Sequence, residues 1–184
     1  MLDSLPSPST DLDALAREER GFTFAHFTCE HAWVIGNILR NALRTVDACA
    51  IIHISASNQT LFHSPSMPGM VPDNEISIQR KRSTVLRWGH STWYMECKFG
   101  GDDRKFAEEY GLWEGQGGRK EYEIRGGGYP VYVKGVEGVV GAIVVAGLDG
   151  DIAHGVVVKA IEEYKELRDG YRSPMRGASM TKLK

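Results

Sequence analysis

The run from Gly138 to Gly147, Gly-Val-Val-Gly-Ala-Ile-Val-Val-Ala-Gly, constrains the fold of this chain more than any other segment. Its residues are apolar at odd and even positions alike, so both faces of an extended strand would be hydrophobic. Such a strand is stable only when other elements cover it on both sides. The run therefore predicts a central strand in a sheet that has helices on both faces.

Four further segments carry apolar residues at the spacing of a helix. We expect helices over residues 30–45 after a Thr28 cap, 73–88 after an Asp73 or Asn74 cap, 103–112, and from Asp149 or Asp151 to about 167. Small polar residues at these starts can accept hydrogen bonds from the free amides of the first turn. These helices are the candidates for the two layers that cover the sheet.

Three shorter segments complete the predicted sheet. Residues 48–55 alternate, with Ala50, Ile52 and Ile54 on one face and Cys49, Ile51 and His53 on the other. A turn at Ser57-Asn58 leads to a short strand that ends near His63, and residues 129–134 join the run at 138–147 through a turn at Gly135–Gly138. Short connections of this kind imply antiparallel pairing. The expected fold class is α+β, a three-layer sandwich of the PAS or profilin type.

Length and charge limit the classes of function. The 184 residues suit one domain, which we place at residues 21–168, between a flexible arm at 1–20 and a disordered basic tail at 169–184. The net charge of -2 provides no overall attraction for nucleic acid. No apolar run approaches the roughly 20 residues needed to span a bilayer, so membrane insertion is not expected.

The three cysteines, Cys29, Cys49 and Cys97, are an odd number without metal-binding spacing. The arm contains no apolar core of a signal peptide. A reducing, cytoplasmic location is therefore expected, and neither a disulfide framework nor a metal site is predicted.

Three consecutive glycines form the best candidate for a ligand site. Gly126, Gly127 and Gly128 precede Tyr129-Pro130, at the entry to a predicted strand. Glycines permit positive φ and leave backbone N–H groups bare, which suits a small anion or a flat ligand. The alternative is a tight strand entry or a contact between subunits.

A cationic helix is the second candidate. Arg80 and Lys81 could neutralise the carboxylates or phosphates of a ligand. Such a run is commonly just a solvated helix face. Lys81 differs, because it lies on the same helical stripe as Ile78 and Val85 and must therefore snorkel, form an ion pair or meet a ligand.

Two histidines remain as candidate ligands of haem iron or carriers of protons. His154 lies in the first turn of the last predicted helix, and His63 ends a strand before a proline-rich loop. The more common interpretation of each is a polar residue at the end of an element. The chain has no G-x-S-x-G elbow, no P-loop and no paired carboxylates that can be placed on one face, so an enzyme is the least favoured class.

As a set, several short motifs are similar to the GlcG/HbpS/PduO-C-terminal superfamily, often called the haem-degrading domain, and within it to a small cytoplasmic branch of fungi and bacteria. They are Ala32-Trp33-x-x-Gly36, Leu61-Phe62 with Met67-Pro68-Gly69, Asp73-Asn74 with Arg80-Lys81, Ser91, Gly127-Gly128-Tyr129-Pro130-Val131, and Gly138-Val139-Val140-Gly141 through Gly147-Leu148 to His154. The resemblance covers about residues 22–167.

The resemblance implies an antiparallel sheet between helices, assembled as dimers or rings of dimers. Distant members bind haem, iron or corrinoids, so haem is a candidate cofactor. The branch has no firmly assigned reaction, and one fungal relative is linked to the delivery of tail-anchored membrane proteins. This chain departs from the branch at Ala153, where an acid is usual, and at Ile76-Ser77-Ile78, where a tryptophan is common, so no ligand contact is transferred.

Three hypotheses follow. The first is an oligomeric protein that binds a small anionic ligand, with planar haem as one candidate, near the glycines. The second is an adaptor or assembly protein whose function is to contact a protein partner. The third is an enzyme of unknown type.

Overall fold

The structure is a computed structural model that describes residues 7–112 and 119–172. Its sheet has the strand order β2-β1-β4-β3, and all neighbouring strands are antiparallel. The strands are β1 (Ile51–Ala56), β2 (Gln59–Pro65), β3 (Gly128–Val131) and β4 (Gly141–Ala146). The apolar run thus becomes an inner strand, as predicted, and all its strand residues are buried.

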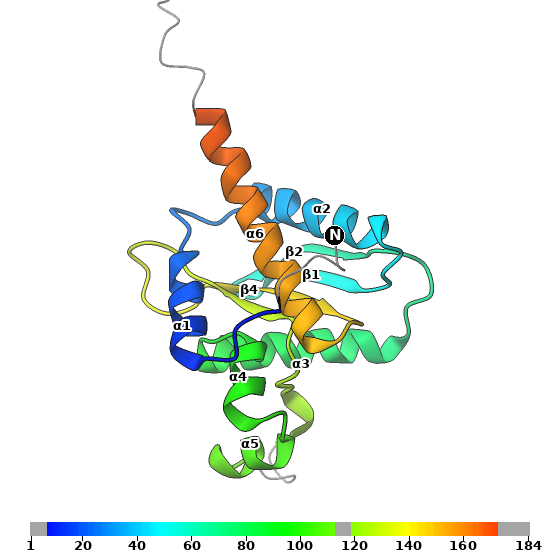
Figure 1. The fold of residues 1–184 in the computed structure, drawn as a ribbon, viewed down its shortest axis with the longest axis vertical. Coiled ribbons are helices and arrows are strands. Elements are labelled where there is room, and N and C mark those ends of the chain that lie inside the picture. The colour runs from blue at the N-terminus through cyan, green and yellow to red at the C-terminus, as the bar shows by residue number, and fades with distance from the viewer. Residues whose placement is uncertain (1–6, 113–118, 173–184) are drawn as a thin grey trace, which may run out of the picture.

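Helices precede, separate and follow the two strand pairs (Figure 1). They are α1 (Leu12–Gly21), α2 (Cys29–Thr45), α3 (Pro72–Trp88), α4 (Thr92–Phe99), α5 (Asp103–Glu109), the 3-10 turn η3 (Arg119–Glu121) and α6 (Gly150–Arg172). Helices α2 and α6 lie on one face of the sheet and α3 lies on the other.

The core confirms the predicted alternation of β1. Ile52 and Ile54 pack in the larger apolar cluster with α2 and α6, whereas Ile51 packs against Ile78 and Val85 of α3. Because successive side chains of a strand point to opposite faces, both layers are required to bury β1 and β4. The α+β three-layer architecture is therefore confirmed.

The expectation of a flexible arm is wrong for residues 12–20, which belong to α1. Leu15 is fully buried, and the carboxylate of Glu19 is buried as well. Glu19 Oε1 accepts a hydrogen bond of 2.7 Å from the backbone N–H of Ser91, and Oε2 lies 2.8 Å from His90 Nδ1. This contact between distant segments anchors α1 beside α4, and the polar composition of the arm gave no sign of it.

Other boundaries differ from the sequence prediction. Helix α3 begins after Val71, with Pro72 in its first turn, because the fixed φ of proline suits that position. The short helix α4 was not predicted. The last helix continues to Arg172, so residues 169–172 are helical, while the rest of the expected tail and the loop at Gly115–Gly118 lie outside the described residues. The extent of the single domain remains a prediction.

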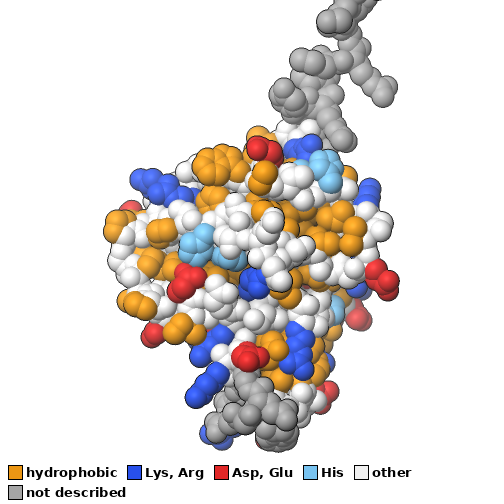
Figure 2. Space-filling model, turned by 180° about the vertical axis from the view of Figure 1, so that it is seen from behind, with side chains coloured by type: hydrophobic (Ala, Val, Ile, Leu, Met, Phe, Trp, Pro, Cys, Tyr) orange, Lys and Arg blue, Asp and Glu red, His pale blue; other side chains and the backbone are white. Residues whose placement is uncertain are grey.

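The face of the molecule shown in Figure 2 carries acidic and basic side chains interspersed with hydrophobic ones. Charges of both signs on one surface partly cancel at a distance. Within the described residues, no helix is both long and apolar enough to cross a bilayer.

Candidate functional site

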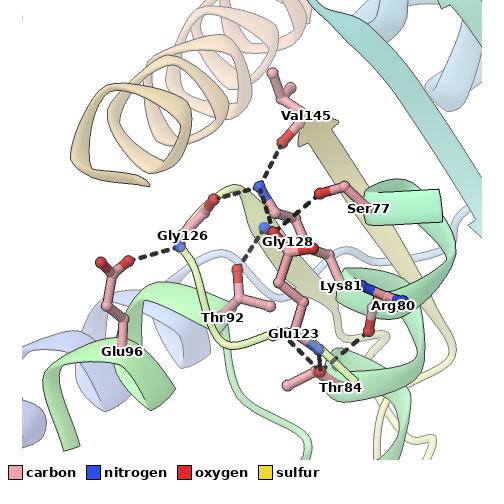
Figure 3. Close-up of polar contacts among 10 residues, drawn as sticks. All are labelled: Ser77, Arg80, Lys81, Thr84, Thr92, Glu96, Glu123, Gly126, Gly128 and Val145. Carbon is pink, nitrogen blue, oxygen red and sulfur yellow. Dashed lines mark hydrogen bonds and ion pairs between the residues drawn. The ribbon is translucent and has the colours of Figure 1, made fainter. Parts of the chain in front are cut away.

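The glycine segment is buried, and two of its amides are bonded within the chain (Figure 3). The N–H of Gly126 donates to Glu96 Oε2 at 2.7 Å, and the N–H of Gly128 donates to Thr92 Oγ1 at 2.8 Å. Both acceptors come from α4, the helix that was not predicted. The bare backbone expected here is thus covered by side chains of the protein itself.

Close backbone packing explains why these positions are glycine. A Cβ atom on Gly126 would lie 2.3 Å from Gly150 O, and one on Gly127 would lie 2.4 Å from Val145 O. Gly127 also has φ +118, a conformation that side chains disfavour. The geometry matches the alternative of a tight strand entry, pressed between β4 and the start of α6.

Lys81 lies on the other side of this segment, with a side chain that is only 1% exposed. Its Nζ donates to Gly126 O at 2.8 Å and to Val145 O at 3.4 Å, and it lies 3.6 Å from Glu123 Oε1. Burial lowers the pKa of Lys81, while Glu123 opposes this shift. The lysine predicted to meet a ligand therefore joins α3, the glycine segment and β4 (Figure 3).

Arg80, the neighbouring cation, has a separate contact. It is half-buried, and its Nε donates to Lys120 O at 2.7 Å. The two cations predicted to act together thus contact different parts of the chain.

Tyr129 and His154 lie together, with ring centroids 5.6 Å apart. Glu18 of α1 joins them, since its Oε1 lies 3.3 Å from His154 Nε2 without the geometry of a hydrogen bond. Both ring nitrogens of His154 and the hydroxyl of Tyr129 are buried without a hydrogen-bond partner. Burial and the nearby carboxylate of Glu18 raise the pKa of Tyr129. Glu18 was not predicted as a site residue, because the sequence placed it in a loose arm.

His63 lies apart from these residues, on β2. It pairs in register with His53 of β1, and the two Nδ1 atoms are 3.1 Å apart. The outer nitrogen of His63, Nε2, lies 3.2 Å from Glu75 Oε2. The structure therefore separates His63 from the glycine segment and joins it to two residues that were not predicted as ligands.

His63 also lines a groove between α2 and β2. Two adjoining hollows of about 400 Å³ each share Arg40. One is lined by Trp33, Asn37, Arg40, Leu61, Phe62, His63 and Ser64, and the other by Arg40, Arg44, Asp47, Pro65, Ser66, Met67 and Pro68. We call these two hollows together the α2–β2 groove. Each volume lies within the range of about 300–1,000 Å³ that is usual for small-molecule sites.

The groove joins an exposed ring to two cations. The side chain of Trp33 is 61% exposed and its ring centroid lies 6.0 Å from that of Phe62. Arg40 donates from Nε to Pro65 O at 3.2 Å. Residues 33, 37, 40 and 44 recur at helical spacing, so they share one face of α2. That spacing was the available sequence signal for this face of the groove.

Within the described residues, no group of three or more His, Cys, Asp or Glu side chains could hold a metal ion.

The buried side chain of His53 resists protonation. Its side chain is buried, and burial together with His63 and Arg82 lowers its pKa from 6.5 to about 4.

We expect this histidine to make the fold sensitive to acid. Between pH 6.5 and 4 the unfolded chain binds a proton at His53 that the folded chain does not. The free energy of unfolding should therefore decrease as the pH is lowered from 6.5 to 4, by roughly 1.4 kcal/mol per pH unit and about 3 kcal/mol in all. Urea unfolding of the wild type and of His53→Gln, at neutral pH and near pH 4, measures the difference. Equal pH dependence in the two proteins would contradict the assignment, and His26→Gln, at an exposed position, is the control.

The fold and the groove define a three-layer α+β sandwich protein with an aromatic and basic depression between one helical layer and the sheet edge. The chain belongs to the family described as "Haem degrading protein HbpS-like", which matches residues 27–162. Helix α1, with Glu18, precedes the matched residues.

Curated relatives and solved structures agree with this assignment. The "UPF0303 protein" of Streptomyces avermitilis is 37% identical over 150 residues, covering 82% of this chain and 88% of the relative. The structure of the Ybr137w protein has a TM-score of 0.77 and 29% identity, over 91% of this chain and 94% of that one. HbpS has a TM-score of 0.56 at 24% identity, over 75% of this chain and 89% of HbpS, and that likeness shows the fold alone.

Proposed function

We propose that this protein is a cytoplasmic, oligomeric binding protein for a small anionic planar ligand, with haem as the first candidate, and that the ligand lies in the α2–β2 groove. The observation that carries the proposal is the convergence of Trp33, Arg40, Arg44 and His63 on this groove. In this proposal the glycine segment and Lys81 stabilise the fold and do not contact the ligand.

Each of these residues has a role that its chemistry supports. The exposed indole of Trp33 offers a flat apolar surface on which a conjugated ring can stack. The guanidinium groups of Arg40 and Arg44 can each hold a carboxylate through two parallel hydrogen bonds. The imidazole of His63 is turned toward His53 and Glu75 on the α3 face of this edge strand, so it can meet a metal in the ring only after its side chain turns out of that contact.

The comparisons support haem as the first ligand to test. The matching family is described as haem-degrading, and a solved PduOC:heme complex shares the fold with a TM-score of 0.59 over 74% of this chain and 93% of that one. At 14% identity that complex says nothing about which residues of this chain would contact the ligand.

Titration of the purified, untagged protein with hemin tests the proposal. We expect a saturable shift of the Soret band in the wild type. The double variant Arg40→Ala/Arg44→Ala should weaken binding by about tenfold or more, since two charge-assisted contacts are lost. His63→Ala should change the spectrum of the bound iron.

The control is His26→Ala, which removes an exposed histidine away from the groove. It should titrate like the wild type. A titration that is unchanged by the arginine variant and by His63→Ala, but abolished by His154→Ala, would move the site to the cluster of Tyr129 and His154. Absence of any Soret shift in the wild type would remove haem as the ligand.

An adaptor role is the second candidate, and the exposed apolar side chains of α2 favour it. Val34 is 37% exposed beside Trp33, and it does not line the groove. If α2 is a protein-binding surface, Val34→Glu should abolish self-association or partner capture in sedimentation and pull-down experiments. The same variant should leave the hemin titration unchanged, and the opposite pattern would argue against an adaptor.

A further inference from the structure

The cross-strand pair of His53 and His63 has an unusual geometry. The two Nδ1 atoms face each other at 3.1 Å, from neighbouring strands that hold them in direct register. Two neutral imidazoles at this distance either share one hydrogen or place two lone pairs toward one point.

The separation of the two nitrogens fits a shared metal ion. An imidazole nitrogen binds a transition ion at about 2.0–2.1 Å, so two such ligands at angles between a right angle and the tetrahedral angle lie roughly 2.9–3.4 Å apart. The observed 3.1 Å falls inside that interval. The backbone pairing of β1 and β2 holds the two side chains close before any ion arrives.

Glu75 favours the tautomer that a metal needs. Its carboxylate lies 3.2 Å from His63 Nε2 without the geometry of a hydrogen bond, and its negative charge favours the ring proton on Nε2 over Nδ1, which faces His53. Histidines that bind metals commonly donate their other N–H to a carboxylate, which orients the ring and raises its basicity.

Some of the surrounding charges favour a bound cation and others oppose it. Arg82 opposes a cation, but its guanidinium is held by Ser55 Oγ at 2.9 Å and by Ser57 O at 2.8 Å. The carboxylate of Glu75 offsets part of that charge.

We propose that His53 and His63 form a binding site for one divalent first-row transition-metal ion. Imidazole nitrogens suit Cu(II), Zn(II) and Ni(II). Two protein ligands leave coordination positions for water. The inference does not rest on the proposed function, because it requires no ligand in the groove.

Equilibrium titration of the untagged protein with CuCl2 or ZnCl2 at pH 7.5, without hemin, tests the site. We expect one ion per chain, and an electron paramagnetic resonance spectrum of the copper form that shows two coupled nitrogens. His53→Gln and His63→Gln should each weaken binding by about tenfold or more. Glu75→Gln should weaken it by about tenfold, as loss of an outer carboxylate does.

Two controls separate this site from others. His26→Gln should bind copper like the wild type. Arg40→Ala/Arg44→Ala should also retain the ion, although it is expected to lose hemin, so the two proposals can fail independently. His63 is exposed, and its variant should therefore fold even if His53→Gln is unstable.

Absence of stoichiometric binding would overturn the proposal. Binding that neither histidine variant weakens, or a copper spectrum that does not change in His63→Gln, would overturn it as well. In those cases the pair shares a hydrogen and only links β1 to β2.

Discussion

Gly127→Ala is expected to unfold the protein or to destabilise it by about 4 kcal/mol or more, at the upper end of single substitutions. The new Cβ would lie 2.4 Å from Val145 O and 2.9 Å from the Cβ of Ala153, so β4 and α6 would have to move apart. The φ of +118 adds backbone strain that an alanine cannot relieve. Urea unfolding followed by circular dichroism measures the loss.

A glycine that also has a positive φ, but lies in open space, provides the control. Gly135 has φ +76, and a Cβ added there would meet no atom within 4 Å, so Gly135→Ala should cost only about 1–2 kcal/mol. If both variants lose the same stability, backbone conformation alone matters. The tight packing of the glycine segment would then have no measurable effect.

Lys81→Met should destabilise the fold by about 3–5 kcal/mol, because breaking a buried ion pair leaves its partners without compensation. Methionine keeps much of the aliphatic length but removes the donor to Gly126 O and Val145 O. It also leaves Glu123, 3.6 Å from Lys81 Nζ, without its cation. Denaturant unfolding at pH 7 gives the value.

The surface lysine Lys159 is the matched control. It is half exposed and pairs with Glu162 at 3.3 Å, so Lys159→Met should change stability by less than about 0.5 kcal/mol. Adding Glu123→Gln to Lys81→Met should recover part of the loss, since the unpaired carboxylate is then neutral. No recovery in the double variant would indicate that the hydrogen bonds to the two carbonyls, and not the ion pair, dominate.

The Gly127 and Lys81 variants also test whether these residues stabilise the fold or bind the ligand. Neither Gly127 nor Lys81 lines the α2–β2 groove. We therefore expect that any folded fraction of Lys81→Met binds hemin with the affinity of the wild type. A selective loss of hemin binding in a folded Lys81→Met protein would return the ligand to the glycine segment.

The elements with strong periodicity were predictable. Residues 138–147 indicated the inner strand, and the alternation at Ile51 and Ile52 gave the correct faces of β1. In both cases the pattern reflects burial along a single segment. Helix α1 was not predictable in this way, because only one small stripe with Leu15 is buried and its anchor, Glu19, bonds to residues more than 70 positions away.

The residues of the candidate site were likewise predictable only where a local pattern marked them. Helical spacing correctly singled out Lys81 as a lysine on an apolar face. No local pattern could show that Glu96 and Thr92 occupy the amides of the glycine segment, since both belong to a helix without a clear apolar stripe. Nor could any local pattern bring Arg40 beside His63.

By itself the sequence determined the antiparallel sheet and its two helical layers, because apolar periodicity is a local property that the order of residues records directly. The family was indicated separately, by the resemblance of several short motifs. The tertiary structure alone decided that Glu96 and Thr92 bind the amides of the glycine segment, that His63 faces His53, and that a groove opens between α2 and β2. Those features depend on distances between segments far apart in the chain, which are set only when the layers pack.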